Sequence, residues 1–539
     1  MKSTMQDVPL SITALFRRGA EMFPDSEVIT FEGERARHTR YATVAERTQR
    51  LAGALRTLGV VEGDRVATLC WNHQEHLEAY FAVPCMGAVL HTLNLRLPPS
   101  QLAQIINHAE DRVVIVDDSL APLLASVIEQ CPSVEKVIVV GSGAVSGLGE
   151  TLAYEDLIAK EPPTFDWPEL DESSAASMCY TTGTTGDPKG VAYSHRSVFL
   201  HSFAVWANFR LDDNARLLTI VPMFHVNAWG MPYAGWMVGG DQLMPGRFLQ
   251  PQGLCEFIRQ ERPTFTGGVP TILTGILHHV QATGADVSSI TRAICGGSAV
   301  PATLITAYRD VLGIELIQAW GMTETSPIGS IALPPKGTAP EDELLYRSKT
   351  GRAVPGVELR IVDDTGAEVA HDGDAVGEIE VRGPWITASY YNTEAPEKFH
   401  DGWLRTGDVG SIDARGYVQI TDRSKDVIKS GGEWISSVEL ETLLVGHPAV
   451  AEAAVVGVHD DRWAERPLAL VVLKAGASAT PDELREFLAP KVARWWLPER
   501  WAFVDELPKT SVGKLDKKLI RSEYGHAKYS VVELEASPR

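Results

Sequence analysis

Residues Tyr180–Gly190, YTTGTTGDPKG, combine four threonines, three glycines and one lysine in a single short run. Glycines allow backbone N–H groups to turn inward around an anion, and the hydroxyls and the lysine add donors and positive charge. The run is not a P-loop, because Gly183 and Gly186 are too close together and Pro188 stands directly before Lys189. Phosphate binding is expected from Thr181, Thr182, Gly183, Thr184, Thr185, Gly186 and Lys189.

The residues on either side of this run predict the layers of an α/β fold that would position it. Arg65–Cys70 and Arg112–Asp117 are short apolar runs typical of buried strands, and Val44–Gly59 carries apolar residues at helical spacing. Alternating strands and helices predict a layered α/β sheet. Leu217–Met223 and Arg292–Ser298 are predicted strands that end at loops, where open α/β sheets gather their functional groups.

The last third of the chain has a different pattern. Residues 351–422 contain period-two alternation and a DTG turn, which predict a β-rich subdomain. A charged joint follows at 423–429, and residues 430–539, with a capping box at Thr480, are predicted to form a small α+β domain. We therefore expect a large N-terminal domain of residues 1–422, a hinge and a mobile C-terminal domain.

Composition restricts the classes of function. The chain has 539 residues, of which 44% are hydrophobic and 22% charged, as is typical of a multidomain globular protein. Its formal net charge of −21 speaks against a nucleic-acid groove, which needs a basic surface. The six cysteines lack metal-ligand spacing and are expected to be buried, reduced thiols. Phe81–Leu90 is the longest apolar stretch and is too short to cross a bilayer, so a cytoplasmic protein without a membrane partner is expected.

Five further motifs follow the threonine- and glycine-rich run along the chain. Together with it they resemble the ordered signature motifs of the adenylate-forming superfamily, which includes acyl-CoA synthetases, peptide-synthetase adenylation domains and firefly luciferase. The resemblance extends from residue 180 to residue 520 and implies that the chain binds ATP. The motifs are CGGSAVP (295–301), QAWGMTETSP (318–327), DGWLRTGDVG (401–410), DRSKDVIKSGGEWIS (422–436) and LPKTSVGKLDKKLI (507–520).

The resemblance implies roles for residues around the nucleotide. Trp320 would stack on adenine, and Thr323 would donate to the α-phosphate. Glu324 is the implied Mg²⁺ ligand, with Thr184 as a second one. Asp408 would accept from the ribose hydroxyls beside Arg423, an ordinary surface salt bridge being the alternative for this pair. The other residues implied at the nucleotide are Gly297, Ser298, Ala299, Gly321 and Met322.

The same resemblance implies roles for lysines in the last third of the chain. Lys514 would reach the carboxylate and the α-phosphate and stabilise the transition state, whereas Lys517 and Lys518 are expected on a solvated helix face. Lys425 lies where the superfamily rotates its small domain, and Lys429 would meet coenzyme A phosphates. Simple exposure is the alternative for both. The other residues implied at coenzyme A are Ser430, Gly431, Gly432 and Trp434.

Val221–Gly240 lies where the superfamily builds its acid pocket, and His225 would approach the carboxylate. Amino-acid-activating members carry an aspartate in this motif, but Phe224–Asn227 contains no acid, so an amino-acid ammonium would be buried without a partner. Bulky aromatic walls predict a short or medium acid and also suit a thioether sulfur. The implied pocket residues are His225, Trp229, Gly230, Met231, Trp236, Gly297 and Gly321.

The resemblance implies a two-step ligase. A carboxylate would react with Mg·ATP to give acyl-AMP and pyrophosphate, and coenzyme A would then displace AMP after the C-terminal domain rotates. The pattern is most similar to bacterial short- and medium-chain fatty-acyl-CoA synthetases and to 3-methylmercaptopropionyl-CoA ligases of dimethylsulfoniopropionate breakdown. We expect 3-methylmercaptopropionate first and a medium-chain or aryl acid second. A luciferase-like oxidoreductase and a non-catalytic nucleotide-binding module are the alternatives from other classes, and a homodimer is the implied assembly.

Overall fold

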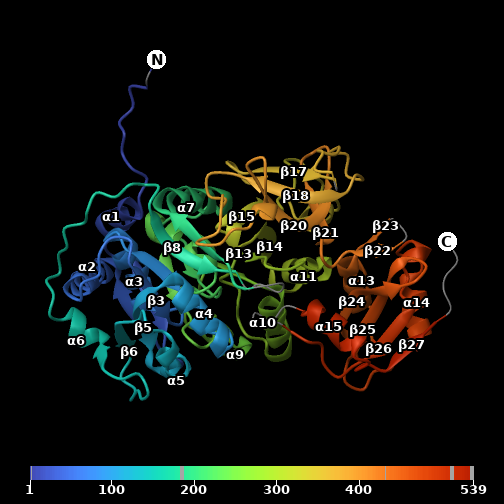
Figure 1. Cartoon of the computed structure of the whole chain (residues 1–539), viewed down its shortest axis with the longest axis horizontal. Coiled ribbons are helices and arrows are strands. Elements are labelled where there is room, and N and C mark those ends of the chain that lie inside the picture. Colours follow the sequence, from blue (N-terminus) through green and yellow to red (C-terminus); the bar gives the residue numbers. More distant parts are fainter. Residues whose placement is uncertain (2, 182–186, 364, 431–432, 510–514, 535–539) are drawn as a thin grey trace. The chain divides into compact units, whose positions relative to one another are not determined.

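The computed structural model divides the chain into two compact units (Figure 1). A large α/β part and a smaller part confirm the predicted fold class. The predicted domain border at residue 422 and the hinge at 423–429 stay predictions. Unit 1 contains residues 1–181, 188–358 and 382–404, and unit 2 contains residues 182–187, 359–381 and 405–539. The structure describes residues 1, 3–181, 187–363, 365–430, 433–509 and 515–534.

A seven-stranded sheet in unit 1 has the order β7–β6–β5–β3–β4–β8–β9. Its neighbouring strands are parallel except for β8 and β9, which form an antiparallel pair. The strands predicted at 65–70 and 112–117 and the helix predicted at 44–59 are confirmed as β3, β5 and α2. The bounds are α2 Tyr41–Thr57, β3 Arg65–Leu69, α3 Gln74–Cys85, β4 Val89–Thr92, α4 Pro99–Ala109, β5 Asp111–Asp117, α5 Ala121–Ala125, β6 Lys136–Val140, β7 Thr151–Ala153, α6 Tyr154–Ile158, β8 Ala175–Tyr180 and β9 Gly190–Ser194.

A nine-stranded sheet in the same unit has the order β16–β15–β14–β13–β12–β10–β11–β1–β2. Its strands are parallel from β14 to β1 and antiparallel at both edges. The bounds are α1 Ile12–Met22, β1 Glu27–Phe31, β2 Ala36–Arg40, α7 His195–Phe209, β10 Arg216–Leu218, α8 Met231–Val238, β11 Asp241–Met244, α9 Pro251–Glu261, β12 Phe265–Gly268, α10 Pro270–Thr283, β13 Arg292–Cys295, α11 Ala302–Ala307, β14 Glu315–Gly321, β15 Ile328–Ile331, α12 Glu343–Arg347 and β16 Arg352–Ala353.

The strand predicted at 217–223 is shorter than expected. β10 ends at Leu218, and the chain leaves the sheet after Thr219, whose N–H still donates to the carbonyl of Leu243 in β11 at 3.0 Å. The carbonyls of Thr219 and Val221 accept hydrogen bonds from the side chain of Asn72 instead of from a neighbouring strand. An apolar run therefore predicted the burial of this segment but not its backbone conformation.

The remaining strands form two antiparallel-rich sheets. A five-stranded sheet has the order β17–β18–β20–β19, with β21 paired to β20, and a six-stranded sheet has the order β23–β22–β25–β26–β27, with β24 paired to β25. The capping box predicted at Thr480 is confirmed at the start of α14. The bounds are β17 Glu358–Val362, β18 Gly377–Arg382, β19 Phe399–His400, β20 Trp403–Ile412, β21 Val418–Arg423, β22 Ile428–Ser430, β23 Glu433–Ile435, α13 Ser437–Val445, β24 Val450–Asp460, β25 Ala464–Leu473, α14 Pro481–Leu488, β26 Arg500–Phe503, α15 Lys517–Gly525 and β27 Val531–Glu533.

The six-stranded sheet is covered by helices on both faces (Figure 1). Val455 of β24 belongs to a core cluster with Leu440 of α13 and Leu484 of α14. The next residue, Val456, belongs to a second cluster with Ile520 of α15. This alternation follows from strand geometry, because successive side chains point to opposite faces.

The cysteines agree with one further expectation. All six cysteines are buried and free, as predicted. Among the described residues, none of the helices is both long enough and apolar enough to span a membrane.

Buried His201 makes the stability of unit 1 sensitive to acid. Burial lowers the pKa of His201 to about 3, and its Nε2 accepts a hydrogen bond from the N–H of Ile328 at 3.3 Å. The ordinary pKa of histidine is about 6.5, so below that pH the unfolded chain binds a proton that the folded chain excludes. We expect this one residue to lower the free energy of unfolding by about 2 kcal/mol between pH 7 and pH 5.

The variant His201→Gln retains an acceptor but does not titrate, so its urea unfolding should lose about 2 kcal/mol less than the wild type over the same pH change. Equal pH dependence in His201→Gln and the wild type would contradict the assignment.

Candidate active site

The threonine- and glycine-rich run lies between β8 and β9, which pair antiparallel as the two strands of a hairpin. The N–H of Thr181 donates to the carbonyl of Lys189 at 2.9 Å, and the N–H of Lys189 donates to Oγ1 of Thr181 at 3.1 Å. A strand follows the run rather than a helix, which agrees with the prediction that it is not a P-loop. Thr182, Gly183, Thr184, Thr185 and Gly186 lie outside the described residues.

Lys189 and Glu324 are brought together through Tyr390. The ammonium of Lys189 lies 4.9 Å from the centre of the Tyr390 ring and 3.8 Å from a carboxylate oxygen of Glu397. The Tyr390 hydroxyl donates to Oε1 of Glu324 at 2.7 Å. One aromatic side chain therefore contacts both the cation of the hairpin and the carboxylate of the QAWGMTETSP motif.

The Thr323–Thr325 turn that carries Glu324 is held at its backbone. The hydroxyl of Tyr193 donates to the carbonyl of Thr323 at 2.7 Å, and the N–H of Thr387 donates to the carbonyl of Glu324 at 2.8 Å. Thr323 and Glu324 are both buried, with exposed fractions of 8% and 6%. The backbone of the turn is thus held by two hydrogen bonds from outside it.

The chemistry of this cluster fits a hard divalent cation. Mg²⁺ prefers carboxylate oxygens and usually binds through one or two of them together with substrate phosphates. The phenol of Tyr390 contacts Oε1 of Glu324, and a carboxylate has a second oxygen with its own lone pairs. Glu324 is therefore a suitable ligand, while the second predicted ligand, Thr184, lies outside the described residues.

The carboxyl ends of β13 and β14 carry the residues predicted to surround adenine. These strands are parallel neighbours, with Cys295 opposite Gln318, so Gly297 and Trp320 follow at the same edge. Gly297, Ser298 and Ala299 are exposed there, and Trp320 and Met322 are half-buried. The Trp320 ring lies against the backbone of Gly329, where an added Cβ would approach it to 2.5 Å.

Gly321 stands at a point where no side chain fits. A Cβ added there would lie 1.7 Å from the carbonyl oxygen of Pro327. Any substitution would therefore displace the chain between Trp320 and the Glu324 turn.

The segment predicted to form the acid pocket, Val221–Gly240 (the acid-pocket segment), has an unusual backbone. Val226, Asn227, Ala228 and Trp229 have φ values of 46°, 49°, 49° and 57°, and Gly230 follows at 73°. Left-handed conformation costs a non-glycine residue about 1–2 kcal/mol, and such strain often occurs at functional sites. The Asn227 side chain stabilises the turn, because its Nδ2 donates to Oγ of Ser177 at 3.0 Å.

This left-handed turn directs Trp229 over two glycines of the sheet. A Cβ added at Gly267 would lie 3.6 Å from the indole, and one added at Gly296 would lie 3.5 Å from it. His225 precedes the turn and, like Trp229, is half-buried. The structure therefore places the Trp229 indole at the carboxyl ends of β12 and β13, four residues after His225.

Trp236 does not share that environment, and its predicted place in the pocket is not supported. Its side chain is fully buried, its ring stacks on Tyr41 at 3.9 Å, and its Nε1 donates to the carbonyl of Phe16 at 2.9 Å. These contacts pack α8 against α1 and α2. Gly230 and Met231 are buried, and a Cβ at Gly230 would approach the His201 ring to 2.6 Å.

In unit 2, Asp408 and Arg423 face each other across β20 and β21. Nε of Arg423 lies 2.8 Å from Oδ1 of Asp408, and the two side chains are 47% and 5% exposed. A buried carboxylate paired with an exposed guanidinium fits a polar ligand such as a ribose, and it also fits the alternative of a structural ion pair.

The residues of the predicted hinge and coenzyme A site lie near each other along β22 and β23. Lys425 and Lys429 are exposed, and the N–H of Lys429 donates to Glu465 at 2.9 Å. Ser430 is buried and accepts from Arg466 at 3.1 Å. Trp434 is the backbone partner of Lys429 in the strand register. Gly431, Gly432 and the predicted catalytic Lys514 lie outside the described residues.

Lys517 corrects one expectation. It was predicted on a solvated helix face, but only 8% of it is exposed and its ammonium lies 2.8 Å from Oε1 of Glu441. The carboxylate pairs with the lysine because an unpaired charge at this depth would be strongly unfavourable. The first turn of α15 therefore faces inward at this position.

Several residues of the candidate site were not predicted from the sequence. Tyr390, Tyr193, Asn72 and His201 hold the turns that carry the predicted residues, yet each acts on a partner far away in the chain. No local spacing pattern indicates such contacts.

Comparison with known proteins shows the family of this chain. Residues 16–391 match the AMP-binding enzyme family, and residues 439–514 match the AMP-binding enzyme C-terminal domain. The chain is 45% identical to a long-chain-fatty-acid–CoA ligase of Thermus thermophilus over 97% of both chains. It is 42% identical to a 3-methylmercaptopropionyl-CoA ligase of Ruegeria pomeroyi over 97% of this chain and 99% of the relative.

Solved structures show the same architecture. The anthranilate CoA ligase AuaEII in complex with anthranoyl-AMP superposes with a TM-score of 0.88 at 27% identity, covering 98% of this chain and 100% of that one. ATP-bound MatB from Rhodopseudomonas palustris superposes with a TM-score of 0.83 at 26% identity, covering 95% and 99%. The predicted superfamily is confirmed, and the chain belongs to the AMP-binding enzyme family.

Proposed function

We propose that this chain, an AMP-forming acid–CoA ligase, acts on a short or medium carboxylic acid, with 3-methylmercaptopropionate as the first candidate. The observation that carries the proposal is the Trp229 indole, which lies over Gly267 and Gly296 next to the segment that contains His225. A large ring at this point shortens the space available to an acyl chain, and an aromatic wall favours contact with a thioether sulfur.

Sequence identity does not separate the candidate acids. Relatives named for long-chain acids, medium-chain acids and 3-methylmercaptopropionate are 45%, 41% and 42% identical to this chain. The choice of acid therefore depends on the pocket residues, and medium-chain and aryl acids are the second candidates.

The proposed reaction proceeds in two steps. An oxygen of the acid carboxylate forms a bond to the α-phosphorus of ATP, and the bond between that phosphorus and the pyrophosphate oxygen breaks. The coenzyme A thiolate then forms a bond to the acyl carbon, and the bond from that carbon to the AMP oxygen breaks. The first step is needed because a carboxylate is a poor acylating agent, whereas the mixed anhydride is a good one.

Residues of both units have proposed roles in the first step. His225 would bind the acid carboxylate, Thr323 would donate to the α-phosphate, and Lys514 would stabilise the charge that develops between them. Trp320 would stack on adenine, and Asp408 with Arg423 would bind the ribose. Lys189 and the hairpin would bind the outer phosphates.

Glu324 would hold Mg²⁺, with Thr184 as the second protein ligand. When bound, the ion would neutralise part of the phosphate charge. Tyr390 orients the carboxylate for this role, because its hydroxyl donates to one oxygen.

The second step is proposed to follow a rotation of residues 430–539 about the hinge at 423–429. Glycine-bearing backbone next to Ser430 would lie against the pantetheine arm, and Lys429 would meet a phosphate of coenzyme A. Lys425 belongs to the hinge, and a homodimer is part of the proposal.

A panel of short, medium, branched, aromatic and thioether acids tests the substrate. We expect coenzyme A esters from the short and medium members, with the thioether acid best, and release of AMP.

In Trp229→Ala the space over Gly267 and Gly296 opens, so the ratio of kcat/KM for long over short acids should rise about tenfold.

The exposed Trp206 supplies the matched control, because Trp206→Ala removes an indole from the surface of α7. An unchanged chain-length profile in Trp229→Ala would remove Trp229 from the pocket. Oxidised products without coenzyme A esters would support the luciferase-like alternative, and absence of acid-dependent pyrophosphate exchange would support the non-catalytic one.

Lys514→Ala separates the two half-reactions. Loss of a preorganised charge should slow acyl-AMP formation by roughly 100- to 1,000-fold. Thioester formation from preformed acyl-AMP should change less than about threefold, because that step no longer needs the charge at phosphorus. Lys509→Ala is the control, since Lys509 is 43% exposed and pairs with Glu452 on the surface. Equal loss in both half-reactions would remove Lys514 from the adenylation step.

Tyr390→Phe tests the orientation of Glu324. The ring that contacts Lys189 remains, but the hydrogen bond to the carboxylate is lost. The Mg²⁺ concentration for half-maximal binding of ATP, followed by isothermal titration, should rise about tenfold. Tyr529→Phe is the control, because it removes a phenol that donates to Glu523 in unit 2. An identical Mg²⁺ dependence in Tyr390→Phe and the wild type would show that Glu324 does not depend on Tyr390.

A further inference from the structure

Asn72 connects the two sheets of unit 1 at the start of the acid-pocket segment. Its Nδ2 donates to the carbonyls of Thr219 and Val221 at 2.7 and 2.8 Å, and its Oδ1 accepts from the N–H of Met223 at 2.8 Å. Only 4% of the residue is exposed. One buried amide therefore satisfies three backbone groups of a segment that has left its sheet.

The residues after Met223 need such support. His225 follows two residues later, and the left-handed turn of Val226–Gly230 begins directly after it. The hydroxyl of Tyr80 donates to the carbonyl of Met223, so α3 also contacts the segment that Asn72 holds. Strained backbone persists only where the surrounding structure fixes it on both sides.

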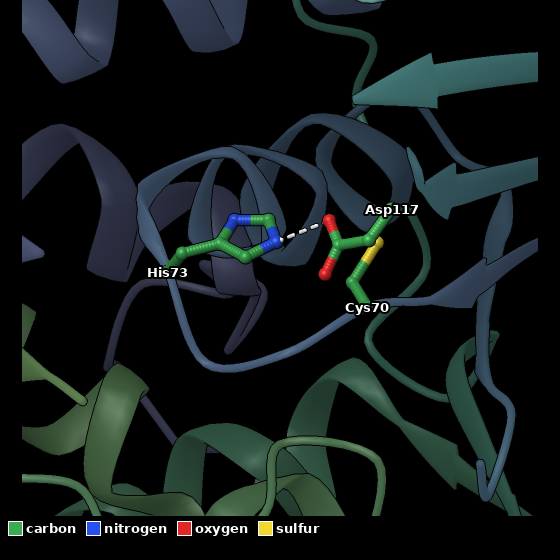
Figure 2. Close-up of side chains that lie close together, drawn as sticks. All are labelled: Cys70, His73 and Asp117. Carbon is green, nitrogen blue, oxygen red and sulfur yellow. Dashed lines mark hydrogen bonds and ion pairs between the residues drawn. The ribbon is translucent and has the colours of Figure 1, made fainter. Parts of the chain in front are cut away.

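The backbone on either side of Asn72 is itself fixed by the cluster of Cys70, His73 and Asp117 (Figure 2). Nε2 of His73 donates to Oδ1 of Asp117 at 2.7 Å, and the N–H of Trp71 donates to Oδ2 of Asp117 at 2.8 Å. The Cys70 thiol donates to the carbonyl of Ile115 at 3.5 Å. These bonds hold the turn between β3 and α3 from which the Asn72 side chain extends.

The same three side chains are also of the types that bind metals, and their ligand atoms lie within 4.8 Å of one another. Their geometry favours the hydrogen-bonded arrangement, because His73 and Asp117 already contact each other directly. Burial and the Asp117 carboxylate raise the pKa of the Cys70 thiol to about 12, so the thiol keeps its proton at neutral pH and donates it to the carbonyl of Ile115. The cluster therefore acts as a clamp on the turn.

We propose that Asn72 is a positioning residue for acid binding, which holds the Thr219–Met223 segment so that His225 and Trp229 reach the acid pocket. The inference rests on the proposed function, because it assumes that this pocket receives the acid. The proposal assigns a role in acid binding to Asn72, which follows β3 of the seven-stranded sheet. Asn72 is about 150 residues away in the chain from Val221, whose carbonyl it contacts. The His73–Asp117 pair supports the turn that carries Asn72.

Two variants and two measurements test the proposal. Asn72→Ala removes all three hydrogen bonds, and Asn72→Asp keeps the size and the acceptor for Met223 but removes both donors. In both, deuterium uptake of peptides covering residues 219–231 should rise while peptides of β3 and β5 stay protected. The KM for the acid should rise about 10- to 100-fold, and the KM for ATP should change less than about twofold.

Asn208→Ala is the matched control, because the Asn208 side chain donates to the carbonyl of Ala204 in its own helix, α7. It should change neither uptake nor the KM for the acid. Unchanged uptake at 219–231 in the Asn72 variants, an equal rise of both KM values, or raised uptake over both sheets alike would overturn the proposal. If the wild type activates no acid, the proposed function fails, while the exchange measurement still decides whether Asn72 holds the segment.

Discussion

Two anions, a carboxylate and a triphosphate, have to meet on a chain whose formal net charge is −21. Like charges about 4 Å apart repel by roughly 4 kcal/mol near a protein surface, so the site must supply local positive charge and exclude competing water. The described residues contribute Lys189 next to Tyr390 and a carboxylate at Glu324 that suits a divalent cation. In the proposed function, Lys514 adds the charge needed at the α-phosphorus.

Close backbone approach gives these groups their places. The Trp229 ring lies on Gly267 and Gly296, and the Trp320 ring lies on Gly329. Each of these two indoles therefore covers a position without a side chain. Gly267 lies in β12 and Gly296 directly follows β13, its neighbour in the nine-stranded sheet, while Gly329 lies in β15 of the same sheet. A Cβ added at Gly296 would approach the carbonyl oxygen of Ala319 to 2.6 Å, and one added at Gly329 would approach the Trp320 ring to 2.5 Å, so these two positions have no room for a side chain.

Many residues of the candidate site could be predicted because they lie in contiguous sequence motifs. YTTGTTGDPKG, with Lys189, and QAWGMTETSP, with Glu324, each combine functional side chains with their turn glycines. The supporting residues could not be predicted, since Tyr390 acts on a carboxylate 66 residues away and Asn72 on carbonyls about 150 residues away. The burial of single residues could not be predicted either. The sequence alone does not tell whether a lysine such as Lys517 or a tryptophan such as Trp236 faces the core or a ligand.

The path of the carboxylate oxygen tests the central claim most directly. An acid labelled at both carboxylate oxygens with a heavy isotope is converted with ATP and coenzyme A, and the products are analysed by mass spectrometry. Attack on the α-phosphorus predicts one labelled oxygen in AMP, one in the thioester carbonyl, and unlabelled pyrophosphate. Unlabelled AMP, or label in the outer phosphates, would contradict an acyl-AMP intermediate and with it the mechanism proposed for this chain.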